Sequence, residues 1–426
     1  MPQLEVPFKR YRIKPSKPSK KEGLNSLYKA SAILWLLLCH RYPSLRINTT
    51  FRFVKEAIRR YRYKLYNLSY ESKCLDYFSM VDLGYMKEKH WVYATYMATM
   101  SSLPISYKTC NAQEILGAIL AKTSLGTGTK LLDNLNDEIH DVSHAFESLD
   151  NMLSAYAEGA YKSVRKDTHN TVTGAENSAF EMGRWVFTTL KPCQIYAPEA
   201  YSTYIKDVMK LYQGQLDSIR HKMAQKDIPS IRRYLDSISE KSIGDIWIDI
   251  DLCFLEGNLG GFSKDESRAI NLLKIGSSLV FKSSLIYDDV QDIYEDLSTN
   301  SINSAIILAI ERGVISQRDL KEKSQNEIFK RMREEGILMK TIKLADMVFL
   351  KGIEMVNSIG SSLDEILDKK GLIQGFRFVR LFNLRKLLIR KKNYENIKLF
   401  LSSLEDFEKI KMNISDDIMA LQRYLD

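Results

Sequence analysis

Proline is scarce in this chain, and its scarcity limits the folds that the chain can adopt. Nine prolines occur in 426 residues, the last is Pro229, and the final 197 residues contain none. Proline and glycine form turns and end helices, so an all-β or doubly wound chain of this length would need many more of both. Because glycine is also scarce, at 20 residues, the sequence predicts an all-α fold of long helices joined by few turns.

The apolar pattern supports helices along most of the chain. From about residue 25 onward, apolar residues recur at spacings of three and four, and no polar–apolar alternation is long enough to indicate a sheet. Breaks between helices are predicted where proline, glycine or small polar residues gather: Tyr42-Pro43, Ser102–Pro104, Thr123–Thr129, Lys191–Pro198, the region around Pro229, and Asn258–Phe262.

Composition divides the chain into three expected regions. Residues 1–24 carry four prolines and seven Lys/Arg without apolar periodicity, which predicts a flexible basic arm. Residues 25–360 predict one helical domain that carries the site, and residues 361–426 predict a C-terminal helical extension.

The net charge of +9 comes from an excess of Lys and Arg near the N-terminus. Residues 1–70 hold 16 Lys/Arg against three acids, whereas the other 356 residues hold 46 against 50. The five cysteines are scattered without a CxxC spacing, which is typical of reduced thiols in a core. No secretory signal is evident, and the longest early apolar run is too short to span a bilayer, so we expect a cytoplasmic protein.

The most informative segment is DDVQD, which places Asp288, Asp289 and Asp292 at positions i, i+1 and i+4. On a helix these three carboxylates crowd one patch, and Asp296 extends it by one turn. Their mutual repulsion must be offset if the patch is partly buried. Mg²⁺ is a cation that proteins bind through one or two carboxylates together with substrate phosphates.

A second acidic stripe lies 155 residues earlier, where Asp133, Asp137 and Asp141 share one helical face. Asn134 supplies a neutral oxygen ligand at the position that Asp289 occupies in the other stripe. A single acidic stripe is usually a solvated helix face. Two such stripes, each behind an apolar segment, would form a divalent-metal clamp for a phosphorylated ligand if they faced each other across a bundle.

These motifs resemble those of the class I isoprenoid synthases, especially the trans-prenyltransferases of the polyprenyl synthetase family. DDVQD resembles their second aspartate-rich motif, and DNLND at 133–137 resembles the first, with Asn134 replacing an aspartate. Between them, YQGQLD at 212–217 is similar to the GQxxD helix, and RRYLDSISEKS at 232–242 is similar to the segment that carries a diphosphate-contacting lysine, here Lys241. The resemblance covers about residues 110–310.

The resemblance implies a helical bundle around a central cavity, in which the two stripes bind three Mg²⁺ ions and the diphosphate of an allylic isoprenoid substrate. The metal ligands would be Asp133, Asn134, Asp137, Asp288, Asp289 and Asp292. Lys241 would contact the diphosphate, with Lys282 and Arg220 as secondary candidates whose alternative is a surface position. Tyr287, Phe281 and Phe180 would line the cavity, although ordinary core aromatics are the favoured interpretation.

The departures from the family concern the acceptor. No arginine follows the first motif up to Asp150, and no GGKR-like stretch precedes it, so the groups that hold isopentenyl diphosphate in elongating members are missing. We therefore expect a prenyl transfer whose acceptor differs from isopentenyl diphosphate. The alternatives are a class I terpene cyclase and a catalytically silent helical subunit. A homodimer is a further expectation.

Three other features lead to weaker predictions. His140 and His144 are i, i+4 partners, but no cysteine or third histidine lies nearby, so we do not predict a zinc site. Residues 369–392 interleave nine Lys/Arg with apolar residues, which fits peripheral contact with an anionic membrane or, more commonly, a helix with one core face. No nucleic-acid-binding module is recognisable, and the body is acidic, so we do not expect nucleic acid as a partner.

Overall fold

The computed structural model describes residues 39–68, 73–162, 171–223, 228–298, 301, 303–391, 402 and 406–425. Within these ranges, the side chains of 137–138, 221–223, 238 and 385–391 are not described. The basic arm predicted for residues 1–24 therefore lies outside the described residues.

The fold is all-α, as predicted, and no strand occurs among the described residues. The longer helices are α2 (Ile47–Tyr66), α4 (Glu88–Ser106), α5 (Ala112–Glu138), α6 (Val142–Ala157), α7 (Thr171–Leu190), α9 (Pro198–Met223), α11 (Gly244–Leu259), α12 (Lys264–Ser298), α16 (Ile337–Asn357) and α17 (Lys369–Lys391). Short elements connect or follow them: η1 (Pro43–Leu45), α3 (Tyr77–Asp82), α8 (Cys193–Tyr196), α10 (Ile231–Asp236), η3 (Ile238–Lys241), α13 (Ser304–Glu311), α14 (Gln317–Glu322), α15 (Gln325–Glu334), α19 (Phe407–Met412), α20 (Asp416–Met419) and η5 (Ala420–Tyr424).

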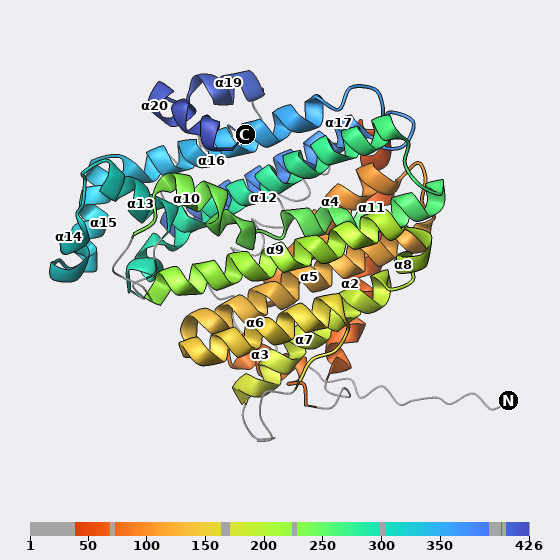
Figure 1. Cartoon of the computed structure of the whole chain (residues 1–426), viewed down its shortest axis with the longest axis horizontal. Coiled ribbons are helices and arrows are strands. Elements are labelled where there is room, and N and C mark those ends of the chain that lie inside the picture. The colour runs from red at the N-terminus through yellow and green to blue at the C-terminus, as the bar shows by residue number, and fades with distance from the viewer. Residues whose placement is uncertain are drawn as a thin grey trace, which may run out of the picture.

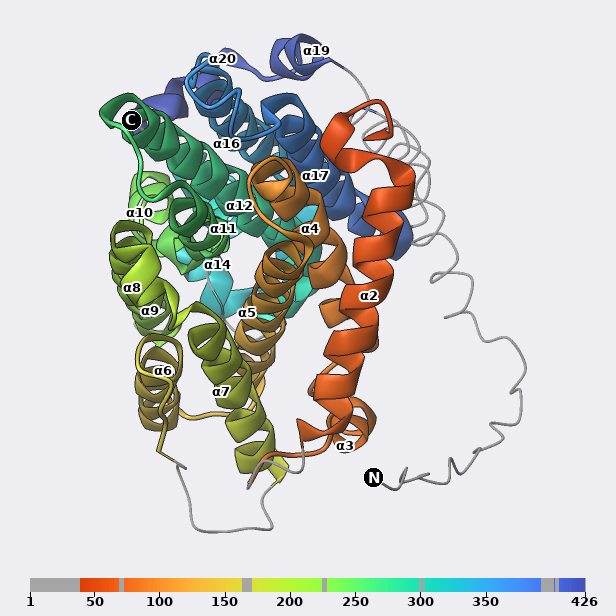
Figure 2. The same ribbon diagram turned by 90° about the vertical axis from the view of Figure 1, so that its right-hand side faces the viewer.

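The long helices lie side by side in a bundle (Figure 1). Helix α11 packs against α4, α5, α9 and α12, and the view along the bundle shows it among the inner helices (Figure 2). Helices α5 and α12 both run from right to left in Figure 1 and end at the same end of the bundle. The α12 stripe and two residues of the second stripe, Asp133 and Asp137, lie near the C-terminal ends of these two helices, so the fold carries them to that common end. The predicted single face through Asp141 is wrong, because α5 ends at Glu138 and Asp141 is the N-cap of α6.

Helices α12 and α16 make the most intimate contact of the bundle, and two glycines allow it. A Cβ atom on Gly276 would lie 2.7 Å from the carbonyl oxygen of Gly352, and a Cβ on Gly352 would lie 2.6 Å from that of Gly276. The two backbones therefore touch where they cross. Helix α12 is also the one helix, among the described residues, that is long and apolar enough to cross a membrane, and 61% of its apolar window is buried, as in a core helix.

The predicted break at Thr123–Thr129 is wrong, because α5 continues through it without interruption. The hydroxyl of Thr127 donates to the carbonyl oxygen of Thr123 at 2.6 Å, so this polar side chain is satisfied inside the helix. A Cβ on Gly128 would lie 3.1 Å from the carbonyl oxygen of Ala179 on α7. These small residues give neighbouring helices room to approach and do not form a turn.

The other predicted breaks fall close to real helix ends. Helix α4 ends at Ser106, so Pro104 lies in its last turn, while the remaining breaks separate successive elements. The break at Ser102–Pro104 is therefore displaced, because α4 continues through it to Ser106. The remaining breaks are confirmed, because proline or glycine stands at or next to the ends of the elements there.

The region after residue 360 packs into the same body. Helix α17 contacts α4, α12 and α16, and its residues Phe376, Phe378 and Phe382 are buried in the main core. Arg380 is also buried, and its Nη2 atom lies 2.8 Å from Asp346 on α16. The apolar side chains of α17 before residue 385, which are the described ones, thus face the core. Membrane contact through 369–392 stays a prediction.

Candidate functional site

The α12 stripe begins with two half-buried carboxylates one helical turn apart, Asp288 and Asp292. Their i, i+4 spacing puts them on one face near the end of α12. Because each side chain keeps some exposure, a ligand from outside the bundle can reach this face.

Asp289 has a different environment, because α10 and α13 surround it. Its Oδ2 atom accepts hydrogen bonds from the hydroxyl of Tyr234 at 2.7 Å, from the backbone N–H of Ser304 at 2.8 Å and from the Ser304 hydroxyl at 2.5 Å. Burial raises the pKa of Asp289 above its ordinary value, against the opposing effects of Lys241 and Ser304. This carboxylate therefore anchors the first turn of α13 to α12.

Asp296 forms a half-buried acidic pair with Asp289. Burial and the neighbouring charge of Asp289 raise the pKa of Asp296 to about 7, although Asn303 donates to its Oδ2 at 2.6 Å. The positive charge of Lys241 opposes the rise of both pKa values. The element that carries Lys241, η3, contacts α12.

Lys241 is held in place by the packing of η3 on α9. Its ammonium donates to the Ser218 hydroxyl at 3.3 Å. A Cβ on Gly214 would lie 2.3 Å from the backbone nitrogen of Lys241, so only glycine at 214 allows this approach. The glycine of the YQGQLD segment therefore sets the position of the lysine.

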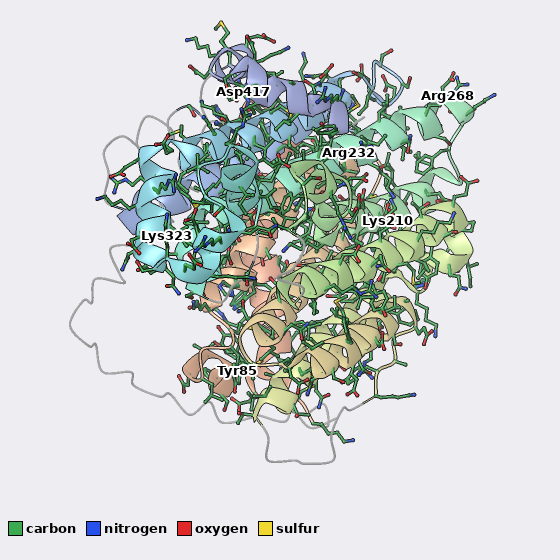
Figure 3. The ribbon with its side chains drawn as sticks, turned by 60° about the vertical axis from the view of Figure 1, so that its left-hand side comes forward. Tyr85, Lys210, Arg232, Arg268, Lys323 and Asp417 are labelled. Carbon is green, nitrogen blue, oxygen red and sulfur yellow. The ribbon has the colours of Figure 1, made fainter. Side chains whose placement is uncertain are left out.

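Two side chains of the α5 stripe are described, Asp133 and Asn134, and both are half-buried. The Lys130 ammonium lies 3.4 Å from Asp133 on the same helix, and both side chains are partly exposed. Asn134 donates from Nδ2 to the carbonyl oxygen of Tyr85 at 3.3 Å, which leaves its Oδ1 atom as the ligand atom. Figure 3 turns this end of the bundle toward the viewer and labels Tyr85 there. The side chain of Asp137 lies outside the described side chains.

The two secondary cations have partners of their own. Lys282 forms an ion pair with Glu240 of η3 at 2.6 Å, and Arg220 pairs with Asp217 on α9 at 3.3 Å. More than half of the Arg220 side chain is exposed, which agrees with the surface alternative. Glu240 offsets the charge of Lys282, so this lysine already has an acidic partner within the bundle.

A third group was not predicted from the sequence. His140, His144 and Glu176 offer one ligand atom each, and these atoms lie within 4.8 Å of one another. The sequence could not connect Glu176 to the two histidines, because it lies 32 residues after His144 and approaches only through the packing of α7. Tyr234 and Ser304 were missed for the same reason, since they reach Asp289 across 55 and 15 residues.

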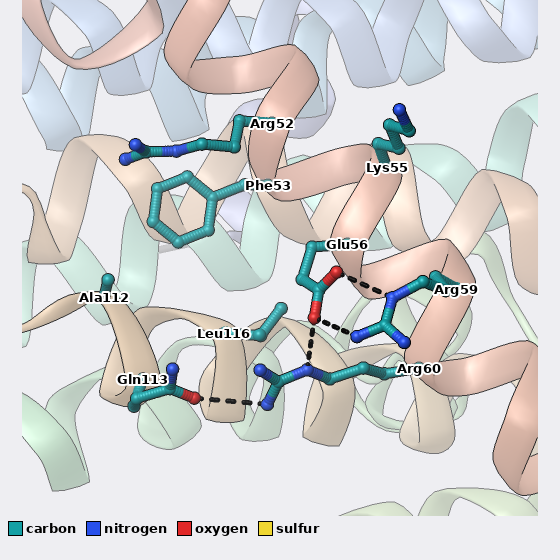
Figure 4. A pocket seen from close by; sticks show the side chains of 9 residues that line it. All are labelled: Arg52, Phe53, Lys55, Glu56, Arg59, Arg60, Ala112, Gln113 and Leu116. Carbon is teal, nitrogen blue, oxygen red and sulfur yellow. Dashed lines mark hydrogen bonds and ion pairs between the residues drawn. The ribbon is translucent and has the colours of Figure 1, made fainter.

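A cavity of about 540 Å³ lies at the opposite end of α5, between α2 and the first turns of α5 (Figure 4). Arg52, Lys55, Arg59 and Arg60 give it a basic lining around Glu56. Hydrogen bonds from Arg59 and Arg60 lower the pKa of Glu56 to about 2. No stripe residue lines this cavity.

The aromatic candidates lie in the packed interior. Phe180 and Phe281 belong to the main core, whereas Tyr287 belongs to a second core around α12 and α16 and donates its hydroxyl to Asp346.

Comparison of the chain with protein-family models and with curated proteins gives no match.

Proposed function

We propose that this protein is a Mg²⁺-dependent, class I prenyltransferase-like enzyme that ionises an allylic isoprenoid diphosphate. It transfers the prenyl group to an acceptor other than isopentenyl diphosphate. The proposal rests on the resemblance of the two motifs, and one structural observation gives it the most support. The element η3, which carries Lys241, packs against α12, and the charge of Lys241 acts on Asp289 and Asp296 at the end of the bundle where α5 also ends.

The side chains at this end fit Mg²⁺ in part. Asp288, Asp292 and Asp133 are accessible oxygen donors, and Asn134 adds a neutral oxygen, which is the donor set that Mg²⁺ prefers. Asp289 fits less well, because its Oδ2 atom already accepts three hydrogen bonds. We therefore assign metal binding to the accessible carboxylates and a positioning role to Asp289.

Bound metal and Lys241 would each stabilise the diphosphate as the substrate ionises. Bound Mg²⁺ supplies positive charge that makes the diphosphate a better leaving group. Lys241 adds a cationic hydrogen-bond donor to the departing diphosphate, which stabilises the charge that develops as the allylic C–O bond breaks. Its attachment to Ser218 and the contact at Gly214 fix the ammonium before substrate binds.

Diphosphate release by the purified full-length chain tests the proposal. The chain is incubated with Mg²⁺ and labelled farnesyl or geranylgeranyl diphosphate, with and without a panel of nucleophilic acceptors. We expect release that needs Mg²⁺ and an acceptor, and a prenylated product. A cyclic hydrocarbon or alcohol without acceptor would instead identify a terpene cyclase. No release under any of these conditions would contradict the enzymatic proposal and favour a silent subunit.

A matched pair of variants tests the metal ligands. Asp288→Ala removes a carboxylate of the stripe, whereas Asp265→Ala removes an exposed carboxylate at the start of the same helix. We expect Asp288→Ala to abolish release and Asp265→Ala to retain it. Full activity of Asp288→Ala would disprove the assignment of this stripe.

A further inference from the structure

The two histidines next to the α5 stripe form part of a compact site with a carboxylate. His140 follows the end of α5, His144 lies in the first turn of α6, and Glu176 comes from α7. Their ligand atoms lie within 4.8 Å of one another. Three separate elements thus direct two imidazoles and one carboxylate at a common point.

The orientation of each histidine is set by a second contact. His140 donates from Nδ1 to the amide oxygen of Asn136 at 2.7 Å, so the lone pair of its imidazole lies on Nε2. Histidines that bind metals typically donate their other ring N–H to a carbonyl or carboxylate in this way. His144 is fixed at its backbone, where its N–H donates to Asp141 at 2.9 Å, and its Nε2 lies 3.1 Å from Glu176.

The electrostatics of the cluster favour a divalent cation. The Glu176 side chain is fully buried, and no lysine or arginine pairs with it among the described residues. A buried carboxylate needs a compensating positive charge. The rings of His140 and His144 stack with their centroids 4.0 Å apart, so both imidazoles lie beside this carboxylate. One metal ion between the two imidazoles and Glu176 would compensate the carboxylate charge.

We propose that His140, His144 and Glu176 bind a zinc-class divalent ion, with water as the fourth ligand. Two imidazole nitrogens and one carboxylate form a donor set that suits Zn²⁺, whereas Mg²⁺ prefers oxygen alone. Ligand bonds near 2.1 Å place tetrahedral ligand atoms about 3.4 Å apart, so binding draws the three side chains together. The ion joins the α5–α6 turn to α7 beside Asn136, and thereby fixes the end of α5 that carries Asp133. This site goes beyond the proposed function and does not depend on it.

Zinc binding to the full-length chain tests the site. Zn²⁺ is titrated in competition with a chromophoric chelator in millimolar Mg²⁺, for the wild-type protein, Glu176→Gln and His40→Ala. We expect one equivalent bound by the wild type and by His40→Ala, whose exposed histidine lies outside the cluster. Glu176→Gln keeps the side-chain volume and is expected to bind at least about 100-fold more weakly, because loss of even an outer-shell partner costs 10–100-fold.

Two further measurements separate this site from binding by the free thiols. Zn²⁺ should raise the Tm of the wild-type protein but not that of Glu176→Gln, and far-UV circular dichroism checks that the variant is folded. Co²⁺ should give a visible spectrum of tetrahedral nitrogen and oxygen ligation without a thiolate charge-transfer band. Equal Zn²⁺ affinity of the wild type and Glu176→Gln, or no bound equivalent in the wild type, overturns the proposal.

Discussion

The ends of α12 and α5 carry acidic stripes with the same helical spacing, yet the two ends differ in their surroundings. At the end of α12, Asp289 accepts hydrogen bonds from α10 and α13, and Asp296 accepts one from the residue that caps α13. The positive charge of Lys241 opposes the rise of the pKa of Asp289. At the end of α5, Asp133 pairs with a lysine of its own helix, and the adjacent turn leads into the His140–His144–Glu176 cluster.

This difference shows that the spacing of carboxylates does not define their role. The i, i+4 pattern places them on one face, but the elements packed against that face decide which remain accessible. The three carboxylates of DDVQD are all half-buried, but Asp289 is hydrogen-bonded to α10 and α13, whereas Asp288 and Asp292 lie one turn apart on one face. The described part of the α5 stripe borders the cluster that we propose as a zinc site. The predictions below test this contrast from the largest expected effect to the smallest.

The two stripes should contribute unequally to activity. We expect Asp288→Asn to lower kcat/KM for diphosphate release by about 10³-fold, because several kcal/mol of charge stabilisation depend on the metal ligands. Asp133→Asn should lower it by only about 10-fold, because Asp133 is already paired with Lys130 and its stripe carries a neutral amide at Asn134. Steady-state kinetics over a range of Mg²⁺ concentrations measure both. Equal losses would remove the contrast between the stripes.

The structural carboxylate should matter more for stability than the open one. Asp289→Ala leaves the Tyr234 hydroxyl and the Ser304 N–H without their acceptor and should lower the free energy of unfolding by about 2 kcal/mol. Asp133→Ala should change it by less than about 0.5 kcal/mol, because its ion pair is partly exposed. Urea unfolding followed by circular dichroism compares the two. A smaller effect at 289 than at 133 would refute the anchoring role.

The half-buried acidic pair of Asp289 and Asp296 should make stability depend on pH. The pKa of Asp296 is raised to about 7 in the folded protein, so its contribution is favourable at low pH and is lost as the pH rises through 7. Asp296→Asn cannot ionise and should therefore be more stable than the wild type at pH 8, by about 1 to 2 kcal/mol, with little difference at pH 4. Asp265→Asn serves as the control on the same helix. A difference that is constant from pH 4 to 8 would show that ionisation of Asp296 is not the cause.

The smallest expected effect concerns the amide of the α5 stripe. Asn134→Asp adds a charged ligand, which should lower the Mg²⁺ concentration for half-maximal activity by about three- to ten-fold. The variant also loses the hydrogen bond to the carbonyl oxygen of Tyr85, at a cost of about 1 kcal/mol in stability. Lower stability without any change in the Mg²⁺ requirement would mean that Asn134 only holds Tyr85.

The sequence predicted what depends on local pattern. The scarcity of proline and the three- and four-residue spacing of apolar residues predicted the all-α fold, which the structure confirms. The diphosphate-contacting role of Lys241, which the resemblance implies, stays a prediction. The break predicted at Thr123–Thr129 failed because hydroxyls can bond within a helix and glycines can serve close packing.

The rest depends on tertiary packing. No pattern along the chain shows that Ser304 would bond to Asp289, that Glu240 would neutralise Lys282, or that Glu176 would meet His144. These contacts join elements that are far apart in sequence, so they arise only when the helices assemble.

The glycine contact between α12 and α16 lies far from the carboxylates of α12, so a small change in the angle at this crossing moves the distant end of the helix. Asp292 lies 16 residues beyond Gly276, which is about 24 Å along a helix axis. A tilt of only about 2° to 3° at the crossing therefore displaces the stripe by about 1 Å. A methyl group at Gly276 would meet the Gly352 backbone and force such a tilt. Since a misplacement of about 1 Å can cost about 10²-fold in rate, the geometry of the acidic end is controlled by two residues that carry no side chain.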